Sequence, residues 1–395
     1  MRKASAEYVR LTLKSGHIIR HPWIFSNAVL HPRRRPAPGA LVEVWARGNV
    51  FAGRGLYHPD RTVAVRLLTR KAEEKLDEDF LFRRLAAARR LREDVLRISE
   101  KSDSYRLVHA EADFLSGLVI DKFAGVLVVQ PFSAGWLTLG EPLAQALSKL
   151  YPDCRVAFRP EDKTEEAEGV SFAPLARQYP LPAFTDIREN GLQLRVDLAA
   201  RHKTGYFLDQ RDNRAMAASF AAGKKVWDLF CYTGGFGLAA AKAGAASVTS
   251  VDLDERALDV AEDNAKRNSL SVNYVHRNCF DFLRDRTAAG ESADIIIVDP
   301  AKLAAVKEEI PRALKTYGDI NRLAIQALAS GGILVSSSCS GLVSESQFLM
   351  VLANAAREAG RELQIFRVTG AAPDHPWSTD FPEGRYLKTV FARAI

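Results

Sequence analysis

Carboxylates and one thiol end four apolar runs in the second half of the chain, and these residue types suit chemistry on a nucleotide-like ligand. Asp228 lies near the end of the run KVWDLF, and Asp252 ends SVTSVD. Asp299 ends DIIIVD, and Cys339 follows GGILVSSS. If the runs are parallel strands, the ends of these strands lie at one edge of the sheet. We therefore expect one site that combines acidic groups with a nucleophile.

The glycine-rich turn after Asp228 predicts a cofactor site. Gly234, Gly235 and Gly237 permit close approach of a ligand to the backbone. Asp252 lies where an acidic residue binds ribose hydroxyls in nucleotide-binding folds. A nicotinamide dehydrogenase would use the same architecture, but the turn departs from GxGxxG and Asp228 would repel a pyrophosphate. The positive sulfonium of S-adenosylmethionine suits Asp228 better, so we expect this cofactor.

The segment RNCF, which follows the third expected strand, is a candidate for adenine binding. Asn278 and the backbone at Cys279 could hydrogen-bond an adenine edge. The side chains of Cys279 and Phe280 could equally serve only in packing, because cysteine and phenylalanine are often buried for that reason alone.

Cys339 and Asp299 predict covalent catalysis on a pyrimidine. A thiolate can add to C6, which turns C5 into the carbon that attacks the methyl group, and a base then removes the C5 proton. A protonated Asp299 could assist by hydrogen bonding to cytosine N3. On base rates a strand-end cysteine is a buried structural thiol, and Asp299 could cap a turn. The serines around Cys339 and its place after the fifth strand favour the nucleophile.

From Lys224 onward, strand-like runs alternate with helical segments at the spacing of βαβ units. The pattern predicts an α/β fold, namely a Rossmann-like class I methyltransferase domain with a mostly parallel seven-stranded sheet. In such a sheet the fourth and fifth strands are expected to neighbour the first. The expected strands cover 225–230, 247–252, 272–276, 294–299, 331–338, 363–369 and 386–393. A β-hairpin from QLRVDL to TGYFLD is expected just before them.

Short strand-like runs separated by proline and glycine predict a small β-barrel in the N-terminal part. These runs cover 8–13, 23–25, 40–45, 50–57 and 63–68. An amphipathic helix is expected over 77–97. Its RRLAAARRLR stretch could touch RNA, but a solvated face is the favoured interpretation of these arginines. A compact α+β region follows over about 100–190. We therefore expect three domains, which cover 1–75, 76–190 and 191–395.

Bulk properties exclude several classes of protein. A chain of 395 residues is long enough for two or three domains. No apolar run approaches the roughly 18 residues that a membrane-spanning helix needs, and no signal peptide is evident, so we expect a cytoplasmic protein that has no contact with a membrane. The four cysteines lie far apart without a CxxC pair, so we expect no metal site.

Positive charge is concentrated at the N-terminal end. Residues 1–75 hold 15 Lys and Arg against 5 Asp and Glu, a net charge of +10, whereas the whole chain carries +7. A positive module on a near-neutral chain indicates a docking surface for nucleic acid, and a solubilising face is the simpler alternative. An RNA base would have to be unpaired or flipped out to react.

The sequence resembles the RlmI-like 23S ribosomal RNA large-subunit methyltransferases over nearly its whole length. The resemblance rests on KSGHIIRHPWIFSNAV, PGALVEVW and FAGRGLYHPDRTVAVRLLTR near the N-terminus, on EADFLSGLVIDKFAGVLVVQ in the middle, and on KTGYFLDQRDNR before the sheet. This family methylates cytosine at C5 and combines an N-terminal PUA domain, a small α+β domain and a Rossmann-like domain. The resemblance implies 23S ribosomal RNA as the partner, S-adenosylmethionine as the cofactor, and Cys339, in the motif SCS, as the nucleophile.

The same resemblance implies a set of residues that line the cofactor pocket. These residues are Phe207, Asp209, Gln210, Arg211, Asp228, Phe230, Tyr232, Gly234, Asp252, Asn278, Cys279 and Asp299. Without the resemblance, the FLDQR segment could equally be a charged turn.

Two departures from the family pattern affect this site. The usual DPPKF is DPAKL here, so Ala301 lacks a rigid proline ring and Leu303 lacks an aromatic ring beside the target base. Asn278 stands where Asp is usual, which keeps hydrogen bonding but removes a charge. Two alternatives stay open: an RNA methyltransferase for another base, such as guanine, with Cys339 incidental, and an inactive protein that binds cofactor and RNA. A homodimer is also left open.

Overall fold

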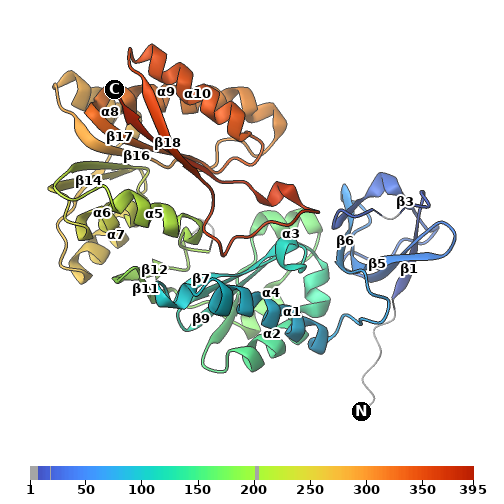
Figure 1. Cartoon of the computed structure of the whole chain (residues 1–395). Coiled ribbons are helices and arrows are strands. Elements are labelled where there is room, and N and C mark those ends of the chain that lie inside the picture. The colour runs from blue at the N-terminus through green and yellow to red at the C-terminus, as the bar shows by residue number, and fades with distance from the viewer. Residues whose placement is uncertain (1–7, 18, 201–203) are drawn as a thin grey trace. The chain divides into compact units, whose positions relative to one another are not determined.

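The computed structural model describes residues 8–17, 19–200 and 204–395, and it forms two compact units (Figure 1). The N-terminal unit comprises Met1–Ile187, Asp197–Gly205 and Pro373–Gly384. The C-terminal unit comprises Arg188–Val196, Tyr206–Ala372 and Arg385–Ile395. Ile18 of KSGHIIR, Lys203 of KTGYFLDQRDNR and the first seven residues of the expected barrel domain lie outside the described residues. The division into three domains stays a prediction.

The first part of the N-terminal unit is a six-stranded sheet, blue in Figure 1. Its strands are β1 (Val9–Leu13), β2 (Trp23–Phe25), β3 (Val29–Leu30), β4 (Leu41–Ala46), β5 (Val50–Tyr57) and β6 (Val63–Thr69), in the order β2-β6-β5-β4-β1-β3. Alternate residues such as Leu11 and Leu13 are buried together, as the period of two in a strand requires. The expected strands are confirmed, and β3 adds a short one.

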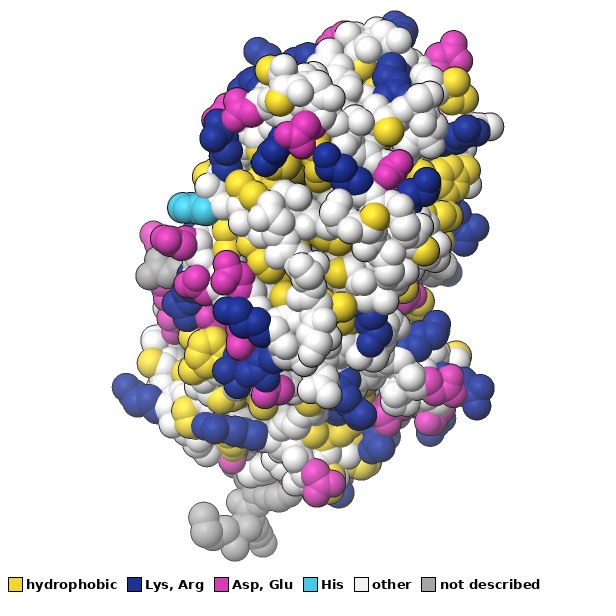
Figure 2. Space-filling model, turned by 90° about the vertical axis from the view of Figure 1, so that its left-hand side faces the viewer, with side chains coloured by type: hydrophobic (Ala, Val, Ile, Leu, Met, Phe, Trp, Pro, Cys, Tyr) yellow, Lys and Arg dark blue, Asp and Glu magenta, His cyan; other side chains and the backbone are white. Residues whose placement is uncertain are grey.

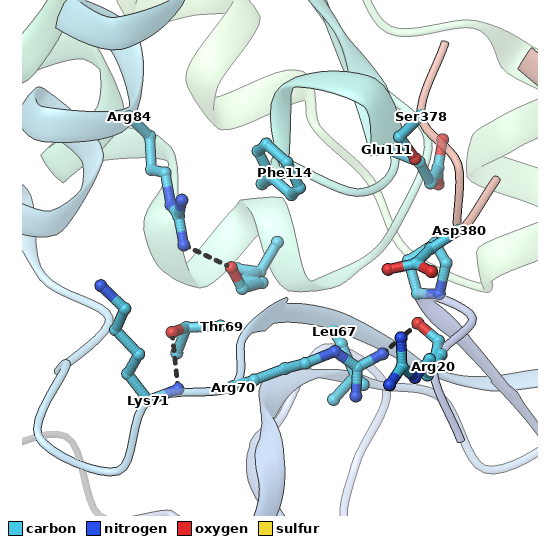
Figure 3. A pocket seen from close by; sticks show the side chains of 12 residues that line it. Arg20, Leu67, Thr69, Arg70, Lys71, Arg84, Glu111, Phe114, Ser378 and Asp380 are labelled. Carbon is cyan, nitrogen blue, oxygen red and sulfur yellow. Dashed lines mark hydrogen bonds between the residues drawn. The ribbon is translucent and has the colours of Figure 1, made fainter. Parts of the chain in front are cut away.

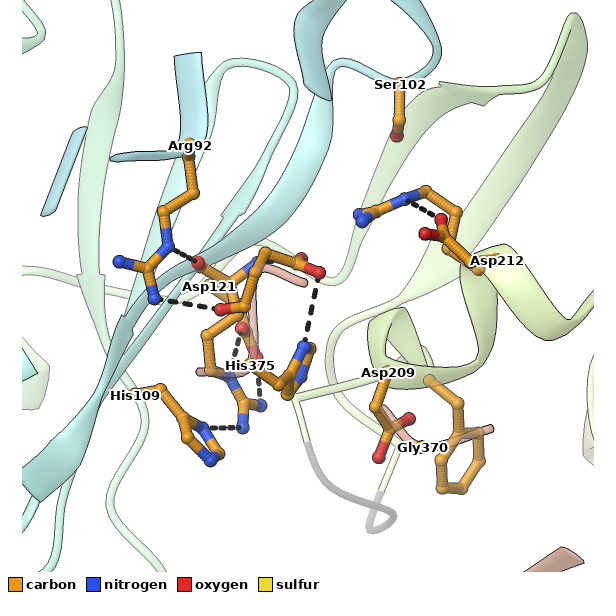
Figure 4. A network of polar contacts seen from close by, with 12 residues as sticks. Arg92, Ser102, His109, Asp121, Asp209, Asp212, Gly370 and His375 are labelled. Carbon is orange, nitrogen blue, oxygen red and sulfur yellow. Dashed lines mark hydrogen bonds and ion pairs between the residues drawn. The ribbon is translucent and has the colours of Figure 1, made fainter. Parts of the chain in front are cut away.

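Helix α1 (Glu78–Arg90) begins where expected, because the Asp77 side chain accepts a hydrogen bond from the Phe80 amide. The prediction that the arginines lie on a solvated face is wrong for Arg92. This residue lies in the π-helical turn Leu91–Val95 and is fully buried. Its guanidinium binds both carboxylate oxygens of Asp113, at 2.5 and 2.8 Å, and the carbonyl of Asp374 at 2.8 Å. These partners compensate the buried charge, and Figure 4 shows Arg92 within a network of polar contacts.

A four-stranded sheet and several helices complete the N-terminal unit. The sheet has the order β10-β9-β8-β7. The strands are β7 (Ser104–His109), β8 (Leu118–Phe123), β9 (Val126–Pro131) and β10 (Arg155–Phe158). The helices of this region are α2 (Gly135–Leu150), α3 (Asp162–Glu168) and α4 (Ala173–Gln178). One hydrophobic core joins Leu56 of β5 with Phe80 of α1 and Trp136 of α2. The first sheet and this region therefore pack as one body.

The hairpin before the large sheet is displaced toward the N-terminus from its expected position. Strand β11 (Phe184–Glu189) pairs with β12 (Leu192–Asp197), whereas TGYFLD forms no strand and contains a 3-10 turn at Leu208–Gln210. Asn190 and Gly191 have φ angles of 48° and 79°. An Asn-Gly pair in this left-handed conformation favours a tight hairpin turn, and it is the local signal that places this hairpin.

The large sheet of the C-terminal unit confirms the predicted α/β fold. Its seven strands have the order β15-β14-β13-β16-β17-β19-β18, and only the pairings of β19 are antiparallel. The strands are β13 (Lys225–Leu229), β14 (Ser247–Asp252), β15 (Asn273–His276), β16 (Ala293–Val298), β17 (Leu328–Ser338), β18 (Leu363–Thr369) and β19 (Lys388–Ala394). The helices are α5 (Arg211–Ala218), α6 (Gly235–Lys242), α7 (Glu255–Arg267), α8 (Cys279–Ala288), α9 (Ile310–Ala327) and α10 (Glu345–Glu358).

Each face of this sheet has its own hydrophobic core. Trp227 of β13 and Ile296 of β16 pack with α8, α9 and α10. Val226 and Ile295, the preceding residues on the same strands, pack with α5 and α6. This alternation buries both faces of the strands, so their ends at the sheet edge are the places left for a ligand.

Within the described residues, no helix combines the length and the apolar character needed to cross a membrane. On the face of the molecule in Figure 2, Lys and Arg side chains are interspersed with Asp and Glu side chains. That face therefore shows no continuous patch of one charge.

Candidate active site

The strand register brings the predicted carboxylates and the thiol to one edge of the large sheet. Asp228 of β13 is paired with Ser250 of β14, two residues before Asp252. Val298 of β16 is paired with Ser336 of β17, so Asp299 and Cys339 follow adjacent strands. One expectation was wrong: β16 neighbours β13, but β17 lies one strand further away, because β16 separates them.

The loop after β13 has an unusual backbone conformation, which hydrogen bonds to Asp252 stabilise. Phe230, Tyr232 and Gly234 have φ angles of 59°, 50° and 78°. The Asp252 Oδ2 atom accepts a hydrogen bond from the Tyr232 amide at 2.7 Å, and its Oδ1 atom accepts one from the Asp254 amide at 3.0 Å. Left-handed conformations cost energy in residues with a side chain, so these bonds maintain a loop that would otherwise relax.

Asp228 lies beneath this loop and is 1% exposed. Its Oδ2 atom accepts a hydrogen bond from the Gly237 amide at 2.8 Å. Burial raises the pKa of Asp228 to about 7, the Gly237 amide opposes this, and the charges of Asp299 and Asp252 raise the pKa further. Asp228 therefore supports the loop and adds negative potential beneath it.

The glycines of the turn are required by the chain itself. A Cβ atom at Gly237 would lie 2.3 Å from Ser250 Oγ, and one at Gly235 would lie 2.9 Å from Arg214 Cδ. Gly234 has a positive φ and caps α6. Contacts within the chain therefore account for glycine at positions 235 and 237, without a ligand close to the backbone.

An ion pair that sequence reasoning missed fixes the segment before α5. Arg214 Nε and Nη2 bind the two carboxylate oxygens of Glu189, each at 2.8 Å, and both side chains are buried. Tyr206 donates to Glu189 at 3.1 Å, and Arg214 Nη1 donates to the Phe207 carbonyl at 2.9 Å. No local signal joins Glu189 to Arg214, because the two residues are 25 positions apart.

Two side chains of the FLDQR segment reach the strand ends. The Phe207 ring lies edge-on to Tyr232 of the loop after β13, with the ring centres 5.2 Å apart. Gln210 Nε2 donates to Asp299 Oδ1 at 2.9 Å and to Ser337 Oγ at 3.2 Å. The segment therefore contacts both the cofactor side and the reaction side of the candidate site.

The two charged side chains of this segment have partners within the C-terminal unit. The Asp209 carboxylate accepts a hydrogen bond from the Tyr386 hydroxyl, and the Asp209 carbonyl accepts one from the Ala372 amide. Arg211 is buried and its Nε donates to Asp212 at 3.2 Å. A role for Asp209 and Arg211 in cofactor binding stays a prediction.

Asn278 caps helix α8. Its Oδ1 atom accepts hydrogen bonds from the amides of Phe280, at 2.9 Å, and Asp281, at 3.4 Å. The side-chain oxygen is thus committed, and the Nδ2 amide is the group that can donate to an adenine ring nitrogen. The Cys279 thiol is buried and accepts a hydrogen bond from the Phe230 amide at 3.3 Å, so its side chain packs beneath the loop.

Cys339 lies beside the DPAKL segment. Its Sγ atom is 3.9 Å from the carbonyl oxygen of Pro300, the residue after Asp299, and the residue is half-buried. The Ser340 Oγ atom accepts hydrogen bonds from the amides of Leu303 and Ala304, both at 3.1 Å. These bonds couple the segment that carries Asp299 to the segment that carries Cys339.

Lys388 is a second residue that sequence reasoning missed. Its ammonium donates to the carbonyls of Ser340, Val343 and Tyr386 at 2.8, 2.7 and 2.9 Å. Burial lowers the pKa of Lys388 to about 8, and the nearby Cys339 opposes this. The sequence places Lys388 in the expected strand 386–393, but nothing in the local pattern indicates that its side chain points into the protein.

The structure also clarifies the DPAKL departure. Leu303 is half-buried and packs against the core on the α9 face of the sheet, whereas Ala301 and Lys302 are exposed. A leucine therefore satisfies the packing at 303, and the exposed position at 301 is where the missing proline would act on backbone freedom.

The residues at this edge fit S-adenosylmethionine, the cofactor that the fold implies. Carboxylates end the adjacent strands β13, β14 and β16, and those of Asp252 and Asp299 each raise the pKa of Asp228. This concentration of negative charge suits sulfonium and ammonium groups and disfavours a pyrophosphate. Asp252 is half-buried, and each of its oxygens has capacity for a further donor such as a ribose hydroxyl.

Family models agree with this geometry. The model for S-adenosylmethionine-dependent methyltransferases matches residues 170–385, and the model for PUA-like domains matches residues 18–70. Two solved structures share the fold: a protein assigned as a methyltransferase and complexed with SAH (TM-score 0.79, 21% identity, 98% and 99% of the two chains), and a Streptococcus mutans protein assigned as a SAM-dependent methyltransferase (0.78, 20%, 98% and 100%). The fold and the site thus define an S-adenosylmethionine-dependent methyltransferase with a PUA-like domain.

Curated relatives match over almost their full length. The chain is 43% identical over 394 residues to Ribosomal RNA large subunit methyltransferase I of Shewanella frigidimarina, which covers 98% of this chain and 99% of the relative. It is 40% identical over 384 residues to the protein of the same name from Aeromonas hydrophila, with 95% and 96% covered. The chain belongs to the ribosomal RNA large subunit methyltransferase I family.

Proposed function

We propose that the chain methylates ribosomal RNA of the large subunit, and that it forms 5-methylcytosine in 23S RNA with Cys339 as the nucleophile. The observation that supports this proposal is the register of β16 and β17, together with the 3.9 Å contact between the Cys339 Sγ atom and the carbonyl oxygen of Pro300, the residue after Asp299. The names of the relatives supply ribosomal RNA as the substrate class. A thiol and a carboxyl group that follow adjacent strands would supply the two functions that addition to a pyrimidine requires.

The cofactor role is proposed for residues on three strand ends and on the FLDQR segment. Asp252 would bind the ribose hydroxyls, and Asn278 Nδ2 would donate to the adenine ring. Phe207 and Tyr232 would pack beside the cofactor, and Asp228 would stabilise its positive charge through the loop above. When bound, S-adenosylmethionine supplies an electrophilic methyl group.

The chain's own residues would perform the reaction on the RNA base. The Cys339 thiol loses its proton to solvent and the thiolate adds to C6 of cytosine, while protonated Asp299 donates a hydrogen bond to N3, and keeps its proton, as negative charge develops there. Gln210 orients the Asp299 carboxyl group through Oδ1. After C5 has gained the methyl group, a base removes the C5 proton, the electron pair restores the C5–C6 double bond, and the Cys339 thiolate leaves.

RNA binding is proposed for the PUA-like domain and its neighbours in the N-terminal unit. Residues 1–75 hold 15 Lys and Arg against 5 Asp and Glu, and this surplus of positive charge supports RNA binding. The target cytosine would be unpaired or flipped out, because a base within a helix is closed to a nucleophile. We place this activity in the cytoplasm, where the four free cysteines would stay reduced.

Bisulfite sequencing of 23S RNA tests this proposal. RNA from cells with the gene deleted should lose one protected cytosine, and a plasmid with the intact gene should restore it. A plasmid encoding Cys339→Ala should fail to restore the mark. Unchanged cytosine protection together with a lost guanine methylation would contradict the cytosine assignment, and no change at any nucleotide would contradict the activity itself.

A further inference from the structure

We propose that a cavity in the N-terminal unit binds one nucleotide of a single-stranded part of the RNA, with its base stacked on Phe114 and its phosphate held by Arg20 and Lys71, beside the fixed positive charge of Arg70. The inference rests on the proposed function, because it takes RNA as the substrate. The cavity has a volume of about 240 Å³ and is lined by residues of the PUA-like domain, helix α1 and the turn after β7. Figure 3 shows these side chains.

Phe114 is the first observation that indicates a ligand. It follows the 3-10 turn Ala110–Asp113 with a φ angle of 59°, and 56% of its surface is exposed. A left-handed conformation costs a bulky residue about 1–2 kcal/mol, and glycine or asparagine usually fills such a position. Packing therefore does not explain an aromatic ring at this place, whereas proteins that bind single strands use such rings to stack bases.

Basic side chains form the opposite side of the cavity. Figure 3 shows Arg70 and Lys71, which follow β6, across the cavity from Phe114 and Arg84. Arg70 Nη2 donates to the carbonyls of Arg20 and His21, so its guanidinium is held in one place. Within the described part of the chain, Lys71 has no ion pair, and its ammonium is free to bind a phosphate.

The carboxylates of the cavity leave this positive charge in excess. Glu111 Oε1 already accepts hydrogen bonds from Trp23 Nε1 at 2.7 Å and from Ser116 Oγ at 2.8 Å, and it pairs with Arg66 at 3.3 Å. Asp380 is the remaining acidic residue of the lining, and its charge acts on Arg70. Arg20 and Lys71 therefore remain for an anionic ligand.

The floor of the cavity is apolar. Pro22, Leu67 and Leu68 contribute apolar side chains to the lining. The guanidinium of Arg84 lies 5.4 Å from the centre of the Phe114 ring, so this ring already makes a cation–π contact. An aromatic ring, an apolar floor and a cationic rim match the base and phosphate of an unstacked nucleotide, and a paired helix would offer no free base to them.

The test measures binding of a fluorescently labelled single-stranded oligoadenylate, about a dozen nucleotides long, to the full-length protein. Phe114→Ala should weaken binding about five- to hundredfold, and Phe114→Trp should retain it, because stacking is lost in one and kept in the other. Lys71→Ala should lower the slope of log affinity against log salt by about 0.7, as expected for one phosphate contact to a single strand.

Matched controls remove the same side-chain types from exposed places outside the cavity. These are Phe184→Ala, at a ring that is 46% exposed, and Lys163→Ala. Thermal unfolding at the wild-type temperature would show that Phe114→Ala keeps the fold. The proposal is overturned if Phe114→Ala and Lys71→Ala bind the oligonucleotide no more weakly than these controls do.

Methyl transfer to ribosomal RNA separates this inference from the proposed function. If the wild-type protein methylates the RNA while Phe114→Ala binds like the controls, the cavity assignment fails and the activity stands. If the wild-type protein methylates no RNA while oligonucleotide binding depends on Phe114 and Lys71, the activity fails and the nucleotide subsite stands.

Discussion

Cys339 differs from the other three cysteines in the surroundings of its sulfur atom. Burial raises the pKa of the Cys231 and Cys279 thiols, that of Cys279 to about 12, and it also raises the pKa of Cys154. Thiols of this kind stay protonated at neutral pH and act as small apolar residues. Cys339 directly follows β17, and its Sγ atom lies 3.9 Å from the carbonyl oxygen of Pro300, the residue after Asp299.

Cys339→Ala should therefore keep cofactor binding and abolish turnover. Removal of a covalent nucleophile costs several orders of magnitude in rate, whereas Cys339 has no proposed contact with the cofactor. Calorimetry with S-adenosylmethionine and methyl transfer to ribosomal RNA measure the two properties. Cys154→Ala is the matched control and should turn over normally. Wild-type turnover by Cys339→Ala would refute the nucleophile assignment.

Asp228 predicts a pH dependence of stability. Its pKa is about 7 in the folded protein against 3.8 for the free side chain. The folded state therefore holds the proton more tightly, and ionisation of Asp228 destabilises the fold as the pH rises from about 4 to 7. Since one pKa unit corresponds to about 1.4 kcal/mol, the effect is at most about 4 kcal/mol.

Asp228→Asn should remove this destabilisation, because its side-chain oxygen can still accept the Gly237 hydrogen bond. Denaturant unfolding should show the variant gaining stability over the wild type between pH 4 and 7, with a constant difference above that. Its affinity for S-adenosylmethionine should fall, because the negative charge is lost. A stability difference that is the same at pH 4 and pH 8 would contradict this account of Asp228.

At the scale of elements, Lys388 on β19 holds the segment that follows β17. Its three hydrogen bonds to Ser340, Val343 and Tyr386 require a protonated amine, since only an ammonium group has three N–H donors. Its pKa of about 8 means that this pattern is complete below pH 8 and loses a donor above it. Lys388 thus fixes the backbone of the segment that follows Cys339, and we propose that it positions the Cys339 thiol.

Lys388→Met should lower kcat more than it raises KM, because carbonyls left without partners let the segment move. In the wild type, kcat should decline above about pH 8, and Lys388→Arg, which stays charged, should shift that decline to higher pH. Lys315→Met, at an exposed lysine, is the control. A high-pH limb of kcat that is unchanged in Lys388→Arg would contradict the positioning role.

The first turn of helix α6 leaves no room for a side chain at Gly237. Gly237→Ala should weaken S-adenosylmethionine binding, since a Cβ atom 2.3 Å from Ser250 Oγ displaces the turn at a cost of about 1–3 kcal/mol. Ser250 Oγ has no hydrogen-bond partner among the described residues, so Ser250→Ala alone should be well tolerated. The double variant should recover part of the affinity in calorimetry, and a purely additive loss would refute the steric explanation.

These elements show why sequence reasoning succeeded for the sheet and failed at particular contacts. The periodic runs and strand-end carboxylates predicted the seven strands and the shared edge that carries Asp228, Asp252 and Asp299. The hairpin was misplaced because the Asn190-Gly191 turn was overlooked. Contacts such as Arg214 with Glu189 join distant positions, and no local period or spacing encodes such pairs.

At the scale of the whole molecule, the basic excess in residues 1–75 predicts salt-dependent RNA binding. Many of these cations have internal partners, as Arg54 has in Glu43 at 2.6 Å, so only some can meet phosphates. Arg33 and Arg34 are exposed in the loop before β4. The double variant Arg33→Ala/Arg34→Ala should lower the salt slope by up to about 1.8, if each residue meets one phosphate of a duplex.

Filter binding of 23S RNA at several salt concentrations measures this slope. Arg312→Ala/Lys315→Ala removes two exposed cations near the start of α9 and serves as the matched control. Equal slopes for the wild type and the N-terminal variant would contradict a docking role for these two arginines.

The central claim, a covalent bond between Cys339 and a cytosine of ribosomal RNA, is tested most directly with RNA that contains 5-fluorocytosine. Fluorine at C5 cannot leave as a proton, so the enzyme should stay bonded to C6 after methyl transfer. The account predicts a complex that survives denaturation, requires S-adenosylmethionine, and is located at Cys339 by peptide mass spectrometry. Methylation of ordinary RNA by the same preparation, with no adduct at Cys339, would contradict it.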